Sequence, residues 1–105
     1  MTEDCEKAAE WDVEWHEAKR LSNLAKRGVD FEDAVAIWLG PVANRRSDQA
    51  SEIRYVPVGR IDSRVVVIVW TPRSGARRLI SARMASSHER QCYTAFVERA
   101  RQGRH

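Results

Sequence analysis

The hydrophobic pattern centres on residues 65–70, a run of six apolar side chains of which five are β-branched. Because a strand points alternate side chains to opposite faces, such a run predicts a strand buried on both faces, in the middle of a sheet. We expect turns at Asp62 and Ser63 and at residues 72–75, leading to neighbouring strands at about 52–59 and 77–84. Pro57 in the first of these strands favours an edge position or a bulge.

Two amphipathic helices are predicted before the sheet. The first spans about residues 17–27 and ends at Gly28, which is placed for a left-handed C-terminal cap. Asp30 caps the second helix, and Gly40 and Pro41 end it. The apolar stripes expected to face the core are Ala18, Leu21, Leu24 and Ala25 in the first helix, and Phe31, Ala34, Val35 and Trp38 in the second.

A short strand and a last helix complete the order of elements. Trp11, Val13 and Trp15 alternate with acidic residues, which indicates a short N-terminal strand. Ser86 and Glu89 are spaced as a capping box that opens a helix, and the apolar stripe of this helix is Tyr93, Phe96, Val97 and Ala100. The fold class is therefore α+β: a short strand, two helices, a three-stranded antiparallel meander and a C-terminal helix, with one sheet face left open.

The length of 105 residues fits a single domain. We place it at residues 13–100, between an N-terminal extension at 1–12 and a mobile tail at 101–105. The acidic N-terminus lacks the apolar region of a signal peptide, and no apolar run reaches the length of a membrane span. Cys5 and Cys92 lie far apart with no metal or redox spacing, which is typical of reduced thiols. We therefore expect a cytoplasmic protein.

Charge divides the chain into two unequal parts. Residues 1–53 carry a net charge of −5 and residues 54–105 a net charge of +8, and all eleven cations of the second part are Arg. Arg has a planar fork that binds phosphate bidentately and stacks on bases. This pattern favours an anionic partner, with nucleic acid as the leading class, over the alternative of an ordinary solvated surface.

Other chemistries find no support in the motifs. The sequence has no nucleophile elbow and no glycine-rich phosphate loop, and its three histidines have no ligand spacing. We therefore predict no metal and no cofactor. Trp38 and Tyr93 lie on apolar stripes and fit the core better than a stacking platform.

The candidate site is a set of cations: Arg54, Arg78 and Arg83, with Lys26 and Arg27 at a helix end. Arg78 lies among apolar residues, where a buried strand position needs an anionic partner. That partner is either a phosphate or one of Glu32, Asp33 and Glu89. Arg78 points away from Arg83 unless a bulge intervenes. We expect guanidinium groups from two β segments to converge on one solvent-facing hollow.

Four segments carry a resemblance to a known family. They are residues 15–19 (WHEAK), 23–34 (NLAKRGVDFEDA) and 78–85 (RLISARMA), followed by Glu89, Arg90 and Tyr93. In this order, with a hydrophobic strand between the second and third, they resemble the BrnT toxins of bacterial type II toxin–antitoxin systems. The resemblance covers about residues 13–95.

The resemblance implies a RelE-like fold and a ribonuclease that cleaves RNA without a metal. It also implies an antitoxin partner of the BrnA kind, a small ribbon-helix-helix protein that covers the basic surface of the toxin in a hetero-oligomer and itself binds DNA. With the arginine cluster, it suggests a catalytic set of Arg83, Arg78, Lys26, Arg54, Tyr93 and Glu89, and an RNA-binding set of Arg27, Arg45, Arg46, Arg77 and Arg90.

Two positions depart from the family pattern. The family commonly has His where Arg27 stands and Asp where His16 stands. A guanidinium does not release its proton near neutral pH, so Arg27 cannot act as a general acid or base. The alternative function is therefore a non-catalytic module that binds nucleic acid or antitoxin. A third interpretation, a structural subunit, predicts an apolar rather than an Arg-rich sheet face.

Overall fold

The structure, a computed structural model, describes residues 12–48 and 51–103. Its α+β architecture follows the predicted order of elements. In chain order these are β1 (Val13–Glu14), α2 (Glu17–Arg27), α3 (Phe31–Ala34), the 3₁₀ helix η1 (Val35–Leu39), β2 (Val58–Ile61), β3 (Arg64–Arg73), β4 (Ala76–Met84) and α4 (Ser87–Gln102). Nearly all of the predicted N-terminal extension, with Cys5 and Trp11, lies outside the described residues, as does His105.

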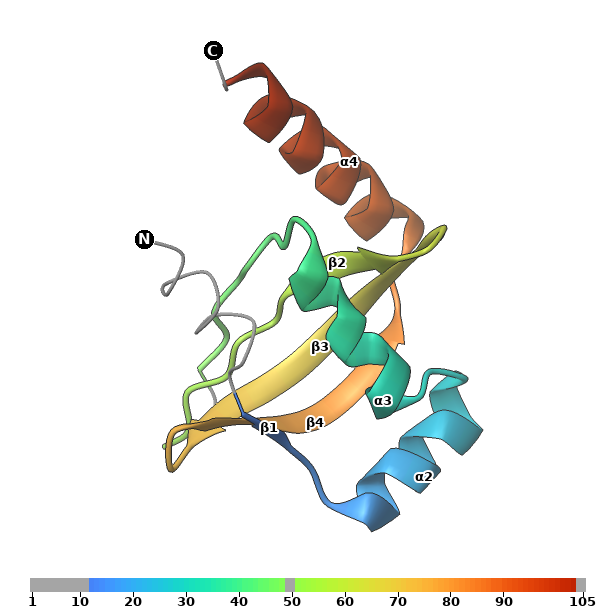
Figure 1. The fold of residues 1–105 in the computed structure, drawn as a ribbon, viewed down its shortest axis with the longest axis vertical. Coiled ribbons are helices and arrows are strands. Elements are labelled where there is room, and N and C mark those ends of the chain that lie inside the picture. The colour runs from blue at the N-terminus through green and yellow to red at the C-terminus, as the bar shows by residue number, and fades with distance from the viewer. Residues whose placement is uncertain (1–11, 49–50, 104–105) are drawn as a thin grey trace.

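The four strands form one sheet in the order β1-β4-β3-β2 (Figure 1). The meander β2-β3-β4 is antiparallel, as predicted, and β3 is central. The sheet as a whole is mixed, because β1 pairs in parallel with β4, with Val13 opposite Arg77 and Glu14 opposite Arg78. The expectation of a purely antiparallel sheet was wrong because β1 joins the free edge of β4, and that choice depends on the tertiary path of the chain.

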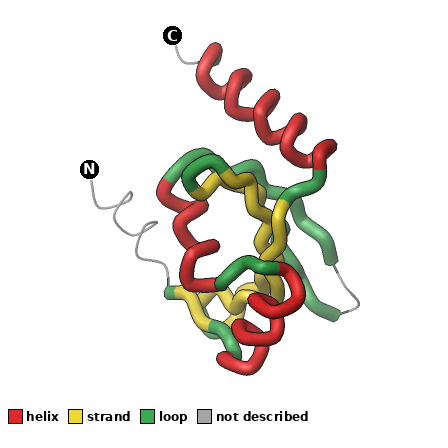
Figure 2. The backbone as a smooth tube through the Cα atoms, turned by 90° about the vertical axis from the view of Figure 1, so that its right-hand side faces the viewer, coloured by secondary structure: helices red, strands yellow, loops and turns green. Residues whose placement is uncertain are grey.

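The central strand β3 has an apolar core on each face, which confirms the prediction from its unbroken apolar run. Val66 and Ile68 pack with Phe31 and Ile37 under α3 and η1, which lie against one side of the sheet (Figure 2). On the other face, Val65 and Val67 belong to a second cluster that includes Val56, Ala85 and Tyr93.

The second predicted helix is two short elements. The Asp30 carboxylate caps it by accepting a hydrogen bond from the backbone N–H of Glu32 at 2.9 Å. After one α-helical turn the chain tightens into η1, so the fully buried residues are Phe31, Ala34 and Ile37, three apart. A 3₁₀ helix has three residues per turn, which puts these positions on one side and leaves Val35 and Trp38 only partly buried.

Helix α2 has the predicted bounds, but the wrong face was assigned to the core. Leu21 is 52% exposed and Leu24 38%, and Ala18 and Ala25 are exposed as well. The buried residue of α2 is Asn23, whose amide nitrogen donates to the carbonyls of Val29 and Ala82 at 3.0 and 2.8 Å. The helix therefore attaches to β4 through a polar side chain, which apolar periodicity cannot reveal.

The strand predicted at 52–59 is regular only over β2. Before β2 the chain makes single bridges, from Tyr55 to Trp70 on β3 and to Arg46 on its outer side. Pro57 has no N–H to donate, although its carbonyl accepts from Ile68 at 3.0 Å. Segment 43–46 lies beside the edge of the sheet through the bridges Ala43 to Val58 and Arg46 to Tyr55.

Helix α4 opens with the predicted capping box, in which Ser86 and Glu89 each accept from the other's backbone N–H. Tyr93 is buried and Phe96 and Val97 are half-buried, but Ala100 is exposed, contrary to the predicted stripe. The helix continues to Gln102, into the predicted tail, and its C-terminal half extends away from the sheet (Figure 1). None of the helices described is long and apolar enough to span a membrane.

Candidate functional site

An open hollow of about 570 Å³ lies at the end of the sheet where β3 turns into β4. Thr71 and Arg73 share the alternation of Val65 and Val67, so the hollow lies on the face away from α3 and η1. The Thr71 hydroxyl donates to the Ile53 carbonyl at 2.7 Å and so ties the segment before β2 to the end of β3. Four cations line this hollow: Lys19, Arg54, Arg73 and Arg78.

A β-bulge places Arg78 on this face. Val69 is opposite Ser81 but Trp70 is opposite Leu79, which leaves Ile80 as an extra residue on β4. The bulge brings Arg78 onto the same face as Arg83, as the sequence allowed. Arg77 consequently lies on the other face, where its guanidinium is 4.2 Å from the Trp38 ring centroid.

Two of the four cations are paired with carboxylates. Arg54 Nε lies 2.9 Å from Glu52 Oε1, and Arg78 Nη1 lies 2.9 Å from Glu14 Oε2. The carboxylates expected as possible partners of Arg78 were Glu32, Asp33 and Glu89, and none of these three is its partner. Glu14 takes this place because the parallel β1 sets it directly opposite Arg78. Within the described chain, Lys19 and Arg73 form no ion pair, so the hollow keeps an excess of positive charge.

Arg83 lies outside the hollow, so the expected convergence holds for Arg54 and Arg78 and fails for Arg83. Its guanidinium holds Glu89 with two bonds of 2.7 and 2.8 Å. These bonds, with the backbone N–H of Ser86, lower the pKa of Glu89 to about 2. A carboxylate that binds its proton so weakly is a poor general base near neutral pH.

The remaining predicted residues are distributed over several places. Tyr93 is buried and donates its hydroxyl to the Pro41 carbonyl at 2.8 Å, and its burial raises its pKa. With Glu89 and Arg45 it lines a small cavity of about 180 Å³. The others are exposed and do not line the hollow. Lys26 and Arg27 lie at the end of α2, Arg46 lies beside Asp48, and Arg90 lies at the base of α4.

Sequence reasoning missed several residues of the hollow, namely Lys19, Glu52, Thr71 and Arg73 together with Glu14. Arg73 stands in a predicted turn and Lys19 in the first turns of a predicted helix, positions typical of ordinary surface charge. Only the pairing of the β3–β4 hairpin with β1 and with the segment before β2 brings them together. In the described part of the chain, no three His, Cys, Asp or Glu side chains come together as a metal-binding group.

The fold and the hollow together describe an α+β domain with an open, cation-lined hollow at one end of its sheet, and such a hollow suits a polyanion such as nucleic acid. A family model described as "Ribonuclease toxin, BrnT, of type II toxin-antitoxin system" matches residues 15–89. The chain therefore belongs to the BrnT family of ribonuclease toxins, and this membership implies an antitoxin partner. A search of curated proteins found no match.

Proposed function

We propose that this protein is a metal-independent endoribonuclease whose hollow binds the scissile phosphodiester of RNA. The observation that carries the proposal is the gathering of Lys19, Arg54, Arg73 and Arg78 around one open hollow in a member of a ribonuclease family. Guanidinium groups stabilise the extra negative charge of a phosphorane. We further propose that the strand–helix–meander–helix arrangement is a RelE-like fold.

Without RNA, Glu52 and Glu14 neutralise Arg54 and Arg78, and Glu52 is also the proton acceptor of the reaction. An RNA phosphate entering the hollow replaces Glu52 and Glu14 as the partner of Arg54 and Arg78. The freed Glu52 carboxylate takes the proton of the ribose 2′-hydroxyl as its oxygen attacks phosphorus, and the Lys19 ammonium gives a proton to the leaving 5′-oxygen. The products are a 2′,3′-cyclic phosphate and a 5′-hydroxyl end. The catalytic roles predicted for Arg83, Lys26, Tyr93 and Glu89 stay predictions.

The test is cleavage of single-stranded RNA by the purified protein in EDTA. Arg78→Gln should lower the cleavage rate by about 10²–10³. Arg83→Ala, measured in parallel, tests the role predicted for that residue. Arg101→Gln is the matched control, because this exposed residue near the end of α4 lies far from the hollow. Equal rates for Arg78→Gln and wild type would remove the hollow from the mechanism, and cleavage abolished by EDTA would refute metal independence.

The alternative function is a non-catalytic module that binds nucleic acid or antitoxin. Two observations favour it: Arg54, Arg78 and Arg83 are each paired with a carboxylate, and Arg27 replaces the family's His. Such a module would leave RNA intact while binding it with an affinity that falls steeply with salt. Induced expression would then cause no growth arrest, whereas the ribonuclease should arrest growth until its antitoxin is co-expressed.

We also propose that a BrnA-like ribbon-helix-helix antitoxin neutralises the protein by covering the hollow in a cytoplasmic hetero-oligomer. The excess positive charge of the hollow supports an acidic segment as the covering element. DNA would then be bound by the antitoxin rather than by this chain. Co-purification with the product of the adjacent gene, lost at high salt, would support this arrangement.

A further inference from the structure

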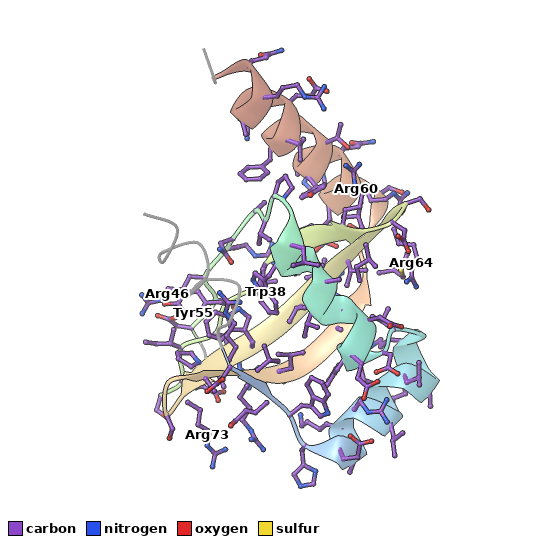
Figure 3. All side chains as sticks on the ribbon, in the orientation of Figure 1. Trp38, Arg46, Tyr55, Arg60, Arg64 and Arg73 are labelled. Atoms are coloured by element: carbon purple, nitrogen blue, oxygen red, sulfur yellow. The ribbon has the colours of Figure 1, made fainter. Side chains whose placement is uncertain are left out.

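A second basic groove lies at the opposite end of the sheet from the hollow. It has a volume of about 640 Å³ and lies between the β2–β3 hairpin and the first half of α4. Figure 3 shows Arg60 beside the start of α4 and Arg73 at the other end of β3. The polar side chains that line this α4 groove are Arg60, Ser63, Ser87, Arg90, Gln91 and Thr94.

No carboxylate in the described part of the chain pairs with the two arginines of the α4 groove. Arg90 donates to the Ala85 carbonyl and the Ser87 hydroxyl, both at 3.1 Å, so neutral oxygens orient it and leave its charge uncompensated. Arg60 makes no ion pair with any described residue. Among the residues that the structure describes, no Asp or Glu lines the groove. In the hollow, by contrast, Arg54 and Arg78 each hold a carboxylate.

The α4 groove and the hollow lie on the same face of the sheet. Along the extended segment before and within β2, Val56 and Val58 pack in the cluster under α4, while Arg54 lines the hollow and Arg60 the groove. Alternation places all four on one face. Arg60 comes six residues after Arg54 along this extended segment, a span of about 20 Å. A bound strand can therefore reach both sites only if it extends several nucleotides along this face.

We propose that the α4 groove binds the phosphodiester backbone of single-stranded RNA a few nucleotides away from the bond cut in the hollow. This inference rests on the proposed function and adds the path of the substrate. Guanidinium, hydroxyl and amide groups are the side chains that contact phosphate and sugar. Among the described residues that line the groove, Val65 and Ala95 are the apolar ones and both are small, whereas a protein partner needs large apolar or aromatic anchors. The groove thus fits a nucleic-acid backbone better than an acidic protein segment.

The binding test uses a labelled 2′-O-methyl RNA of about 12 nucleotides, which lacks the attacking hydroxyl and is not cut. Its affinity for the full chain is measured over a range of salt. The double variant Arg60→Gln/Arg90→Gln should bind about tenfold or more weakly. Its slope of log affinity against log salt should be shallower by about 1.4, because each lost phosphate contact contributes about 0.7. The control Arg99→Gln/Arg101→Gln removes two charges from the protruding end of α4 and should keep the wild-type slope.

Cleavage gives an independent readout. With a long RNA, the groove variant should show a raised KM and an unchanged kcat, and with a dinucleotide substrate it should match wild type, since a dinucleotide reaches only the hollow. The single variant Arg60→Gln changes one exposed side chain and guards against misfolding of the double variant. If the protein binds RNA with the expected salt slopes but never cleaves it, the proposed ribonuclease activity is refuted, while the proposed RNA binding by the α4 groove stands.

Two outcomes would overturn the inference. An unchanged salt slope in both groove variants would show that no phosphate binds there. If polyglutamate competes with the RNA for wild-type protein, and the groove variants lose affinity for polyglutamate but not for RNA, the groove serves an acidic protein partner instead.

Discussion

Replacing Asn23 by Ala should remove the main polar attachment between α2 and the sheet. The Asn23 amide donates to the Ala82 and Val29 carbonyls, and its oxygen accepts from the Ala82 N–H at 3.2 Å. The Asn23 amide therefore pairs with the backbone of Ala82 at the edge of β4, further along the strand than Arg77 and Arg78, which pair with β1. Asn23 as a whole is only 9% exposed, so water does not readily replace its amide.

The expected cost follows from the groups left without partners. A buried N–H or C=O that loses its partner costs about 1–3 kcal/mol. The two groups of Ala82 alone therefore give about 2–6 kcal/mol, and water entering the space left by the amide brings the expected loss to about 2–4 kcal/mol. For a domain of this size that loss corresponds to a fall in Tm on the order of 10–20 °C.

The assay is urea unfolding of wild type and Asn23→Ala, with the slope m compared to verify that the same surface is exposed. Ser22→Ala, an exposed neighbour on the same helix, is the control and should change the free energy of unfolding by less than about 0.5 kcal/mol. Asn23→Asp keeps the shape but sets a carboxylate against two carbonyls, so it should lose at least as much as Asn23→Ala. A loss below about 0.5 kcal/mol for Asn23→Ala with unchanged m would refute the reasoning.

Two further predictions follow from the fold. Leu21→Ser should change the free energy of unfolding by less than about 0.5 kcal/mol because Leu21 is half exposed, and a loss of 2 kcal/mol or more, typical of a core leucine, would show that α2 buries its apolar face after all. Glu89 has a pKa lowered from 4.5 to about 2, so its pairing with Arg83 stabilises the fold fully above pH 4.5. After allowance for solvent screening of this partly exposed pair, that stabilisation is on the order of 2 kcal/mol, and it is lost as the pH falls from about 4.5 to about 2. When the free energy of unfolding is measured against pH, Glu89→Gln should not show the loss that wild type shows between about pH 4.5 and about 2. Identical pH profiles for variant and wild type would contradict the role assigned to the Glu89–Arg83 pair.

The sequence by itself determined the elements that depend on neighbouring residues. Signals a few residues long predicted the bounds of α2, the cap at Asp30, the capping box of Ser86 and Glu89 and the turn at Asp62 and Ser63. The turn predicted at 72–75 is shorter, because Pro72 and Arg73 still pair within β3. The unbroken apolar run predicted the central position of β3, because the residues of a single strand are enough to indicate that both of its faces are buried. Family membership also followed from motifs in the chain.

The tertiary structure alone decided which of these elements meet. Asn23 finds its partner 59 residues away on β4, and Arg78 finds Glu14 64 residues away through a parallel pairing. The bulge at Ile80 then decides which face carries Arg78, and a shift of one residue moves a side chain across the sheet. The periodicity of apolar residues does not reveal a polar attachment such as Asn23. The number of charged residues likewise does not show which arginines are paired with carboxylates. The site is therefore a product of long-range pairing, whose partners no short stretch of sequence specifies.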